Sequence, residues 1–223
     1  MEIPTPFPAG SFMGLLDPAD QLELIRDGRR MTLPAGATLL FEGDLSERVV
    51  VVLDGAVRIF VTAANGREVL VTVAGPGEIM GEMSAVDGKA HSASVNTLDE
   101  ADVVLVPAAS FRAVMQRNAA VAFAVAARLT RELRRVLQER VGLEVLDVPT
   151  RLAQTMVALA DRLDVRDGSV ELPVSQRELA ESCGASREAV TKALSTFRAR
   201  GWIETGRRSI KVLDLEAVRN RAS

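Results

Sequence analysis

The sequence predicts an α+β protein with an N-terminal antiparallel β-barrel or jelly roll, a long helix, and a C-terminal winged helix–turn–helix. Short β-prone runs separated by glycine fill residues 31–107, a pattern typical of antiparallel barrels and sandwiches. The apolar period then becomes helical over residues 119–143. Residues 176–195 have the spacing of two short helices joined at Gly184. We expect domain boundaries at residues 1–118, 119–147 and 148–223.

Bulk properties narrow the class of protein. A chain of 223 residues is long enough for two domains. No apolar run approaches the roughly 20 residues that span a bilayer, and the first residues do not resemble a signal peptide. The single cysteine, Cys183, excludes an internal disulfide. We therefore expect a cytoplasmic protein without membrane attachment.

Charge is distributed unevenly along the chain, whose net charge is −3. Residues 148–223 hold 13 Lys/Arg and 10 Asp/Glu, whereas the remainder holds 14 and 20. Residues 175–211 hold 8 basic and 4 acidic side chains. We interpret this asymmetry as an acidic regulatory part joined to a basic part that binds nucleic acid. A solvated helical face alone would also produce so small a surplus.

The first part should begin with a helix and continue as strands. Asp17 can act as N-cap of that helix, with Pro18 at its first position and its end near Gly28. The pair Asn65-Gly66 between alternating apolar residues predicts a hairpin in which both residues have positive φ. The expected strands are MTL, TLLFE, VVVVLDG, VRIFVT, EVLVTVA, SASVNT and ADVVLVP.

The long helix carries two apolar stripes. One stripe follows alternating steps of four and three residues, interrupted by Arg140, which is typical of a helix pair. The other, Val125, Leu137 and Val141, is expected to pack on the chain's own barrel. Two stripes need two partners, so we favour a homodimer over a single amphipathic helix in a monomer. The predicted dimer seam is Ala122, Ala126, Leu129, Leu133, Val136 and Leu143.

A hinge is predicted at LDVP, residues 146–149. Asp147 can cap the next helix while Pro149 occupies its first turn. The part that follows should be helical to about Arg200 and then form a β-hairpin in GWIETGRRSIKVL.

The helix–turn–helix carries the chemistry of DNA recognition. Ser175 and Glu178 can form a capping box on its first helix, and Ser186 can cap the second. An arginine can bind guanine in the major groove, and a glutamate can accept from cytosine. Cys183 is expected to be a core residue between the helices. Base contacts are predicted from Arg187, Glu188 and Lys192, and phosphate contacts from Ser175, Gln176, Ser186, Arg207 and Arg208.

The stretch GEMSAVDGKAHSAS, residues 81–94, indicates a loop that receives an anion. A Gly-Glu turn precedes Lys89 and the only histidine, His91. From the residues alone it is a working ligand site, a disabled one, or lining of the barrel.

The order of these parts is similar to that of a known family. A glycine-rich barrel with a Gly-Glu turn, a long helix, the LDVP-x-R hinge and then GASREAVTKAL with a hairpin resemble the CRP/FNR family of bacterial transcription regulators. The resemblance covers nearly the whole chain and is nearest to the actinobacterial cyclic-AMP receptor-like branch. It implies a cyclic-nucleotide-binding-like barrel and a homodimer on a two-fold-symmetric double-stranded DNA operator. TGTGA-type half-sites would be read through Arg187 and Glu188, and activators also contact RNA polymerase.

The resemblance also describes the effector pocket. Members that bind cyclic AMP have Gly-Glu followed by Arg-Ser, and here His91 stands in place of the arginine. Iron–sulfur members need a cysteine cluster and haem members need Cys or His ligands, so we expect no metal, haem or cluster. The pocket residues carried over are Gly81, Glu82, Met83, His91, Ser92 and Ala93.

Three pocket positions on the long helix also differ from the family pattern. Aligned back from LDVP without gaps, Glu132 corresponds to a cation near the phosphate. Val136 and Leu137 correspond to polar residues that hold adenine. Lys89 and Arg135 are the cations that could compensate.

These differences lead to a hypothesis about regulation. His91 pairs with Glu82 or Glu132, so that the protein binds DNA without cyclic AMP or responds to another ligand. Two alternatives stay open: His91 is a tolerated loop residue in a vestigial pocket, or cyclic AMP binds in the usual way.

Other classes of function fit the sequence less well. A cyclic-nucleotide-binding module of an enzyme or channel would not need the helix–turn–helix. A cupin-type enzyme or a Ser-His-Asp hydrolase would require more than a single histidine. We therefore expect a regulator without enzymatic activity.

Overall fold

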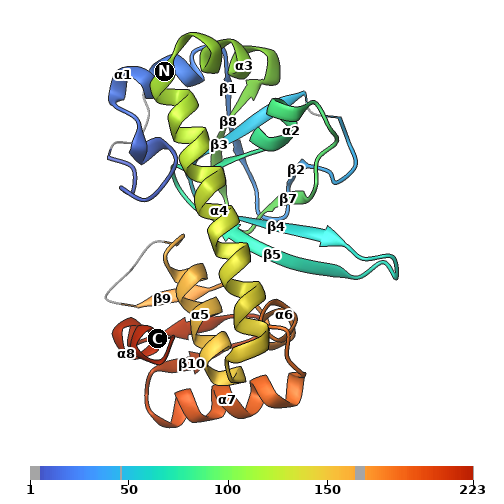
Figure 1. Ribbon diagram of the computed structural model, residues 1–223, viewed down its shortest axis with the longest axis vertical. Helices are drawn as coiled ribbons and strands as arrows, with labels where there is room; N and C mark the ends of the chain where they lie inside the picture. The colour runs from blue at the N-terminus through green and yellow to red at the C-terminus, as the bar shows by residue number, and fades with distance from the viewer. Residues whose placement is uncertain (1–5, 46, 164–168, 223) are drawn as a thin grey trace. The chain divides into compact units, whose positions relative to one another are not determined.

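The computed structural model describes residues 6–45, 47–163 and 169–222. The chain divides into two compact units, residues 1–68 with 72–133, and residues 134–223 with 69–71 (Figure 1).

The first unit combines short strands with helices at its beginning and end. Its elements are η1 (Met13–Leu15), α1 (Pro18–Ile25), β1 (Arg29–Leu33), β2 (Thr38–Leu40), β3 (Arg48–Asp54), β4 (Val57–Thr62), β5 (Glu68–Ala74), β6 (Ile79–Met80), α2 (Glu82–Asp87), β7 (Ser94–Thr97), β8 (Ala101–Pro107), α3 (Ala108–Arg117) and the first part of α4 (Ala119–Val145).

The strands form two four-stranded sheets, ordered β1-β8-β3-β6 and β2-β7-β4-β5. Strand β3 is buried on both faces because side chains alternate across a strand. Val50 and Val52 contribute to the core formed by both sheets. Val49 and Val51 contribute to a second core shared with α1, α3 and α4. The predicted α+β fold with an N-terminal jelly roll is confirmed, and the two sheets remain open rather than closing into a barrel.

Two local predictions in this unit are wrong. The Asn65-Gly66 hairpin forms, but only Gly66 has a positive φ, of 77°. Its N–H donates to Ala63 O at 2.8 Å, and the Ala63 N–H donates to Arg67 O at 2.8 Å, which makes a wider turn. The stretch interpreted as a loop from Gly81 begins instead with the helix α2.

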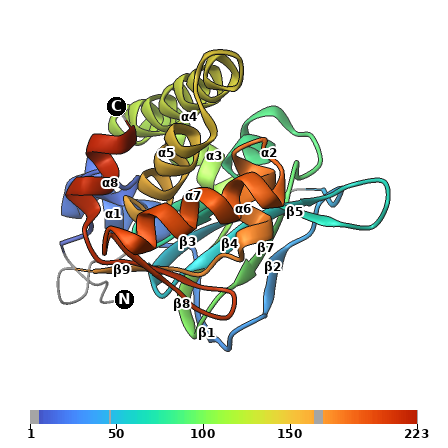
Figure 2. The same cartoon turned by 90° about the horizontal axis from the view of Figure 1, so that it is seen from below.

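The second unit contains the end of α4 and a winged helix–turn–helix. Helices α5 and α8 pack along each other, and α7 packs on α5 (Figure 2). Strand β9 makes the predicted hairpin a three-stranded sheet of order β10-β11-β9. Neither β9 nor α8 was predicted. The elements are α5 (Val148–Ala160), β9 (Val170–Leu172), α6 (Gln176–Ser182), α7 (Arg187–Ala199), β10 (Ile203–Thr205), β11 (Ile210–Val212) and α8 (Leu215–Ala222).

The predicted helix caps are confirmed. Asp17 accepts a hydrogen bond from the Asp20 N–H at 2.9 Å, and Asp147 accepts one from the Thr150 N–H at 2.8 Å. Ser175 forms the capping box on α6, and Ser186 caps α7. These caps satisfy backbone donors that a helix cannot satisfy internally, so the sequence determines where these helices begin.

Helix α4 has different environments along its length. Val121, Ala124 and Val125 are buried in the core of the first unit. Leu137 and Val141 belong to the second unit and are 56% and 59% exposed. No helix in the described part of the chain is long and apolar enough to cross a membrane.

Candidate nucleic-acid interface and effector pocket

The second helix of the helix–turn–helix, α7, has one buried face and one exposed face. Val190, Ala193, Leu194 and Phe197 recur at helical spacing and are buried. Arg187, Glu188 and Lys192 are all exposed, as predicted.

The exposed face of α7 is available to a ligand. Across the part of the chain that the structure describes, the side chains of Arg187, Glu188 and Lys192 make no hydrogen bond or ion pair. Arg187 occupies the first position of α7, where the positive end of the helix dipole disfavours a cation by about 0.3–1 kcal/mol. A cation without a partner at such a position is suited to bind a ligand that offers hydrogen-bond acceptors.

The polar residues predicted to contact phosphate have local roles as well. The Ser175 hydroxyl accepts from the Glu178 N–H at 3.2 Å and donates to the Glu178 carboxylate at 2.7 Å. Gln176 Oε1 accepts from the Thr191 hydroxyl at 3.2 Å, which joins α6 to α7. The Ser186 oxygen accepts from the Ala189 N–H at 3.2 Å. The capping box thus uses the hydroxyl proton of Ser175. The side-chain amide N–H groups of Gln176 remain available to donate to a phosphate.

The turn between β10 and β11 carries two further cations. Arg207 and Arg208 are both exposed. Arg208 has φ +61°, a left-handed conformation that non-glycine residues adopt at a cost of about 1–3 kcal/mol. The Gly206 N–H closes the turn by donating to Ser209 O at 2.8 Å. The turn therefore presents two adjacent arginines at the tip of the wing.

The effector pocket predicted in the first unit is centred on Gly81. This residue has φ +85° and precedes α2. A Cβ atom here would lie 2.9 Å from Arg48 O and 3.3 Å from His91 Cε1. Only glycine fits this conformation and this space.

The adjacent Glu82 is buried and bound by an arginine of α4. Arg128 Nε lies 3.2 Å from Glu82 Oε1, and Arg128 Nη1 lies 2.6 Å from Glu78 Oε2. Arg128 Nη2 donates to Ile79 O at 2.9 Å. One guanidinium therefore joins two buried carboxylates to α4.

Arg128 is not among the residues predicted from the sequence, although its position along α4 contains a signal. Arg128 follows the buried Ala124 by four residues and Val125 by three, so it lies on the same face of α4. A charged residue on a buried stripe needs a partner of opposite charge. Burial alone would lower the pKa of Arg128, but Glu82 and Glu78 outweigh burial and raise it.

His91 is buried and held mainly by its backbone. Its N–H donates to Asp44 O at 2.8 Å, and its carbonyl accepts from the Gly43 N–H at 2.9 Å. Burial lowers the pKa of His91, opposed by Asp44, with Arg48 lowering it and Glu82 raising it. The hypothesis that His91 pairs with Glu82 or Glu132 is wrong, because the His91 side chain makes no hydrogen bond or ion pair with any described residue. The Glu82 carboxylate is bound by Arg128 instead.

The lowered pKa of His91 predicts a pH dependence of stability. As pH falls through about 6.5, the unfolded chain takes up this proton before the folded chain does. This histidine therefore destabilises the fold below about pH 6.5 and has no effect well above it. Thermal unfolding of the parent and of His91→Gln is compared from about pH 8 to about pH 5.5. As the pH falls, the variant should lose less stability than the parent. Parallel curves for the two proteins would contradict the prediction.

The remaining predicted pocket residues differ in their exposure. Met83 is 51% exposed, Ser92 is exposed, and Ala93 is half-buried. Glu132 is half-buried in the first unit, whereas Val136 and Leu137 belong to the second unit and are exposed. Lys89 and Arg135 are the cations that could compensate for the missing pocket arginine. Lys89 is 82% exposed near Asp87, and Arg135 pairs with Glu139.

Among the described residues, no group of three or more His, Cys, Asp or Glu side chains could hold a metal ion.

Comparisons with known proteins match both units. The family described as Cyclic nucleotide-binding domain matches residues 30–118, and the Crp-like helix-turn-helix domain matches residues 150–221. A CRP-like cAMP-activated global transcriptional regulator of Mycobacterium tuberculosis is 32% identical over 217 residues, 96% of each chain. A cyclic AMP receptor protein of Thermus thermophilus is 31% identical, covering 90% of this chain and 91% of that protein.

A solved structure extends the similarity to three dimensions. A CRP-family transcriptional regulator from Thermus thermophilus has a TM-score of 0.66 and 28% identity, covering 87% of this chain and 96% of that chain. Sequence and structure thus agree across both units. The chain belongs to the CRP family of DNA-binding transcription regulators and carries a cyclic nucleotide-binding domain.

Proposed function

We propose that this regulator is a homodimer that reads TGTGA-like palindromic half-sites in double-stranded DNA. The observation that carries the proposal is the unpaired, exposed set Arg187, Glu188 and Lys192 on the first turns of α7. Arginine and glutamate at these positions suit guanine and cytosine in the major groove. Phosphate contacts from Ser175, Gln176, Ser186, Arg207 and Arg208 would fix the register without reading sequence.

The dimer is supported by the exposed apolar side chains of α4. Single exposed apolar residues are ordinary, but a row along one helix favours a partner. Pairing α4 with a second copy would bury this row and place the two recognition helices about one turn of DNA apart. The exposed apolar residues of α4 are Phe123, Leu133, Val136, Leu137, Val141, Leu143 and Val145.

The effector pocket supports regulation that does not use cyclic AMP in the usual way. Arg128 binds two carboxylates, Glu78 and Glu82, so its guanidinium already has acidic partners on two sides. Burial keeps His91 neutral near pH 7, so it brings no positive charge to a phosphate. An anionic nucleotide would enter a site whose arginine is already bound.

A second candidate is a regulator activated by cyclic AMP. It is favoured by the match to a cyclic nucleotide-binding domain and by relatives named as cAMP-activated. Calorimetric titration of the full chain with cyclic AMP distinguishes the two candidates. We expect no binding in the micromolar range, and micromolar binding would favour the second candidate.

The proposed partners are operator DNA, a second copy of the chain and, where the protein activates, RNA polymerase. We propose a cytoplasmic regulator without enzymatic activity, and this rests on family membership. Gel-shift assays with TGTGA-N6-TCACA DNA test DNA recognition: a complex should form on this operator and not on a scrambled duplex of equal length.

A further inference from the structure

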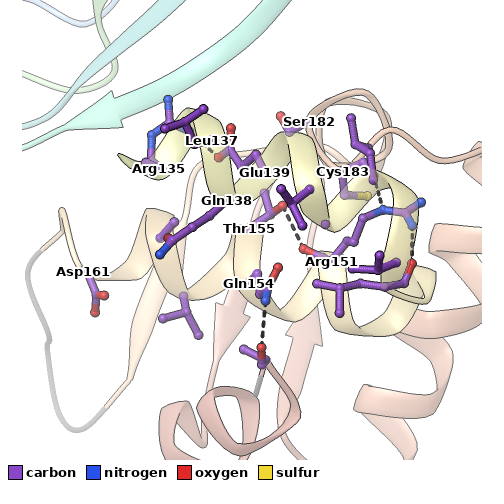
Figure 3. A pocket seen from close by; sticks show the side chains of 18 residues that line it. Arg135, Leu137, Gln138, Glu139, Arg151, Gln154, Thr155, Asp161, Ser182 and Cys183 are labelled. Carbon is purple, nitrogen blue, oxygen red and sulfur yellow. Dashed lines mark hydrogen bonds and ion pairs between the residues drawn. The ribbon is translucent and has the colours of Figure 1, made fainter. Parts of the chain in front are cut away.

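An open cavity of about 770 Å³ lies within the second unit. It is bounded by the C-terminal half of α4, by α5, and by Ser182 and Cys183 at the end of α6 (Figure 3). Most of its lining is apolar, and Arg151 of α5 contributes a cation to its wall. Figure 3 shows the Arg151 side chain extending toward Cys183.

Arg151 binds backbone carbonyls from two separate segments. Its Nη1 donates to Leu146 O at 2.5 Å, at the end of α4. Its Nε donates to Cys183 O at 2.8 Å, and its Nη2 lies 3.3 Å from Gly184 O. Cys183 and Gly184 form the turn between α6 and α7. A single guanidinium therefore connects the end of α4 to the turn of the helix–turn–helix.

The chemistry of these acceptors explains why an arginine is suited to the position. The last carbonyls of a helix have no partner within the helix and carry partial negative charge. Leu146 follows the last residue of α4, and Cys183 is the C-cap of α6. Arg151 thus acts as a cap for two helix C-termini at once. A lysine has no planar fork and cannot reach all three oxygens in the same geometry.

A second contact joins the same two segments independently. Gly184 has φ +59°, and a Cβ atom there would lie 2.5 Å from Leu143 Cδ2 on α4. The side chain of Leu143 therefore sits directly against the backbone of the turn. Two contacts of different kinds, one polar and one apolar, hold the turn against α4.

The geometry points to Arg151 as a positioning residue that sets the direction of the recognition helix α7 relative to the dimer helix α4. Helix α7 begins at Arg187, three residues after Gly184, so the direction in which α7 leaves the turn depends on where the turn is held. This inference rests on the proposed function, because α4 would fix the partner copy and hence the distance between two α7 helices. Arg151 itself contacts no DNA in this scheme, and its effect is on the spacing of half-sites.

The test measures how affinity depends on half-site spacing. Full-length parent, Arg151→Gln and Arg151→Lys are titrated onto TGTGA-N6-TCACA and onto operators with the spacer shortened or lengthened by one base pair. For Arg151→Gln we expect affinity for the N6 operator to fall about tenfold or more, the effect of losing charge-assisted hydrogen bonds. The preference for N6 over the other spacers should also become weaker. The affinity and the spacer preference of Arg151→Lys should lie between those of the parent and those of Arg151→Gln.

Two further variants make the result specific. Arg177→Gln removes an exposed arginine of α6 that pairs with Glu181, and it should keep the parent's spacer preference. Gly184→Ala keeps Arg151, but its added methyl group would collide with the side chain of Leu143 on α4. This variant should therefore weaken the spacer preference as Arg151→Gln does. Thermal unfolding of every variant reports separately on folding.

The outcomes separate the two levels of the proposal. If Arg151→Gln and Gly184→Ala keep the parent's spacer preference, or lose affinity equally on all three operators, the contact only supports folding and the inference is overturned. If the parent itself is monomeric or has no preference for the palindrome, the proposed function fails instead.

Discussion

Replacing Arg128 by leucine is expected to lower the free energy of unfolding of the first unit by about 3–5 kcal/mol, the usual cost of breaking a buried ion pair. The substitution removes the cation from two carboxylates, Glu78 and Glu82, both of which are buried. Each carboxylate would stay unpaired in a medium of low polarity or take up a proton. Urea unfolding monitored by circular dichroism measures the change.

Controls for Arg128→Leu follow from the same geometry. Arg26→Leu in the first unit disrupts an ion pair between two exposed side chains and should leave stability nearly unchanged. Adding Glu78→Gln and Glu82→Gln to Arg128→Leu should recover part of the loss, since no buried charge then lacks a partner. A loss no larger for Arg128→Leu than for Arg26→Leu would contradict the structural role of Arg128.

Replacing Arg187 by alanine is expected to abolish discrimination at one guanine of each half-site, at a cost of about 1–3 kcal/mol per half-site. The side chain is exposed and makes no contact within the described residues, so the fold should keep its stability. Binding to the operator and to operators altered at each guanine measures the effect. Without Arg187, the affinity for the intact operator should equal the affinity for the operator altered at the guanine that Arg187 contacts.

A matched control tests whether the effect is only one of charge. Arg177→Ala removes an exposed arginine from α6 that pairs with Glu181, four residues along the same helix. This variant should bind all DNA duplexes more weakly by a similar factor, or bind them as the parent does. If Arg187→Ala binds operator and random DNA as the parent does, α7 is not the element that recognises bases.

Local patterns predicted much of the fold because they act over a few residues. Asp17, Asp147, Ser175 and Ser186 cap the helices that they were expected to cap. Each of these interactions joins residues about three positions apart, so the sequence contains both partners. The change of apolar period correctly located the transition from strands to helices near Ala108.

Predictions that depended on distant contacts succeeded less often. Strand β9 is short, and its pairing with β11 joins residues about forty positions apart, which no local pattern reveals. The partner of Glu82 depends on which face of α4 meets the sheet, and for that reason Arg128 could not be predicted in place of His91. The turn at Asn65 differed because a wider turn leaves only Gly66 with positive φ.

The binding of operator DNA in the absence of cyclic AMP tests the central claim most directly. Purified full-length protein is titrated onto TGTGA-N6-TCACA DNA in gel-shift assays, with and without cyclic AMP, at one fixed salt concentration because phosphate contacts depend on salt. We predict a complex in both series, with affinities that differ by less than about threefold, or well under 1 kcal/mol. A complex that forms only when cyclic AMP is present would contradict the proposal and identify a regulator activated by cyclic AMP.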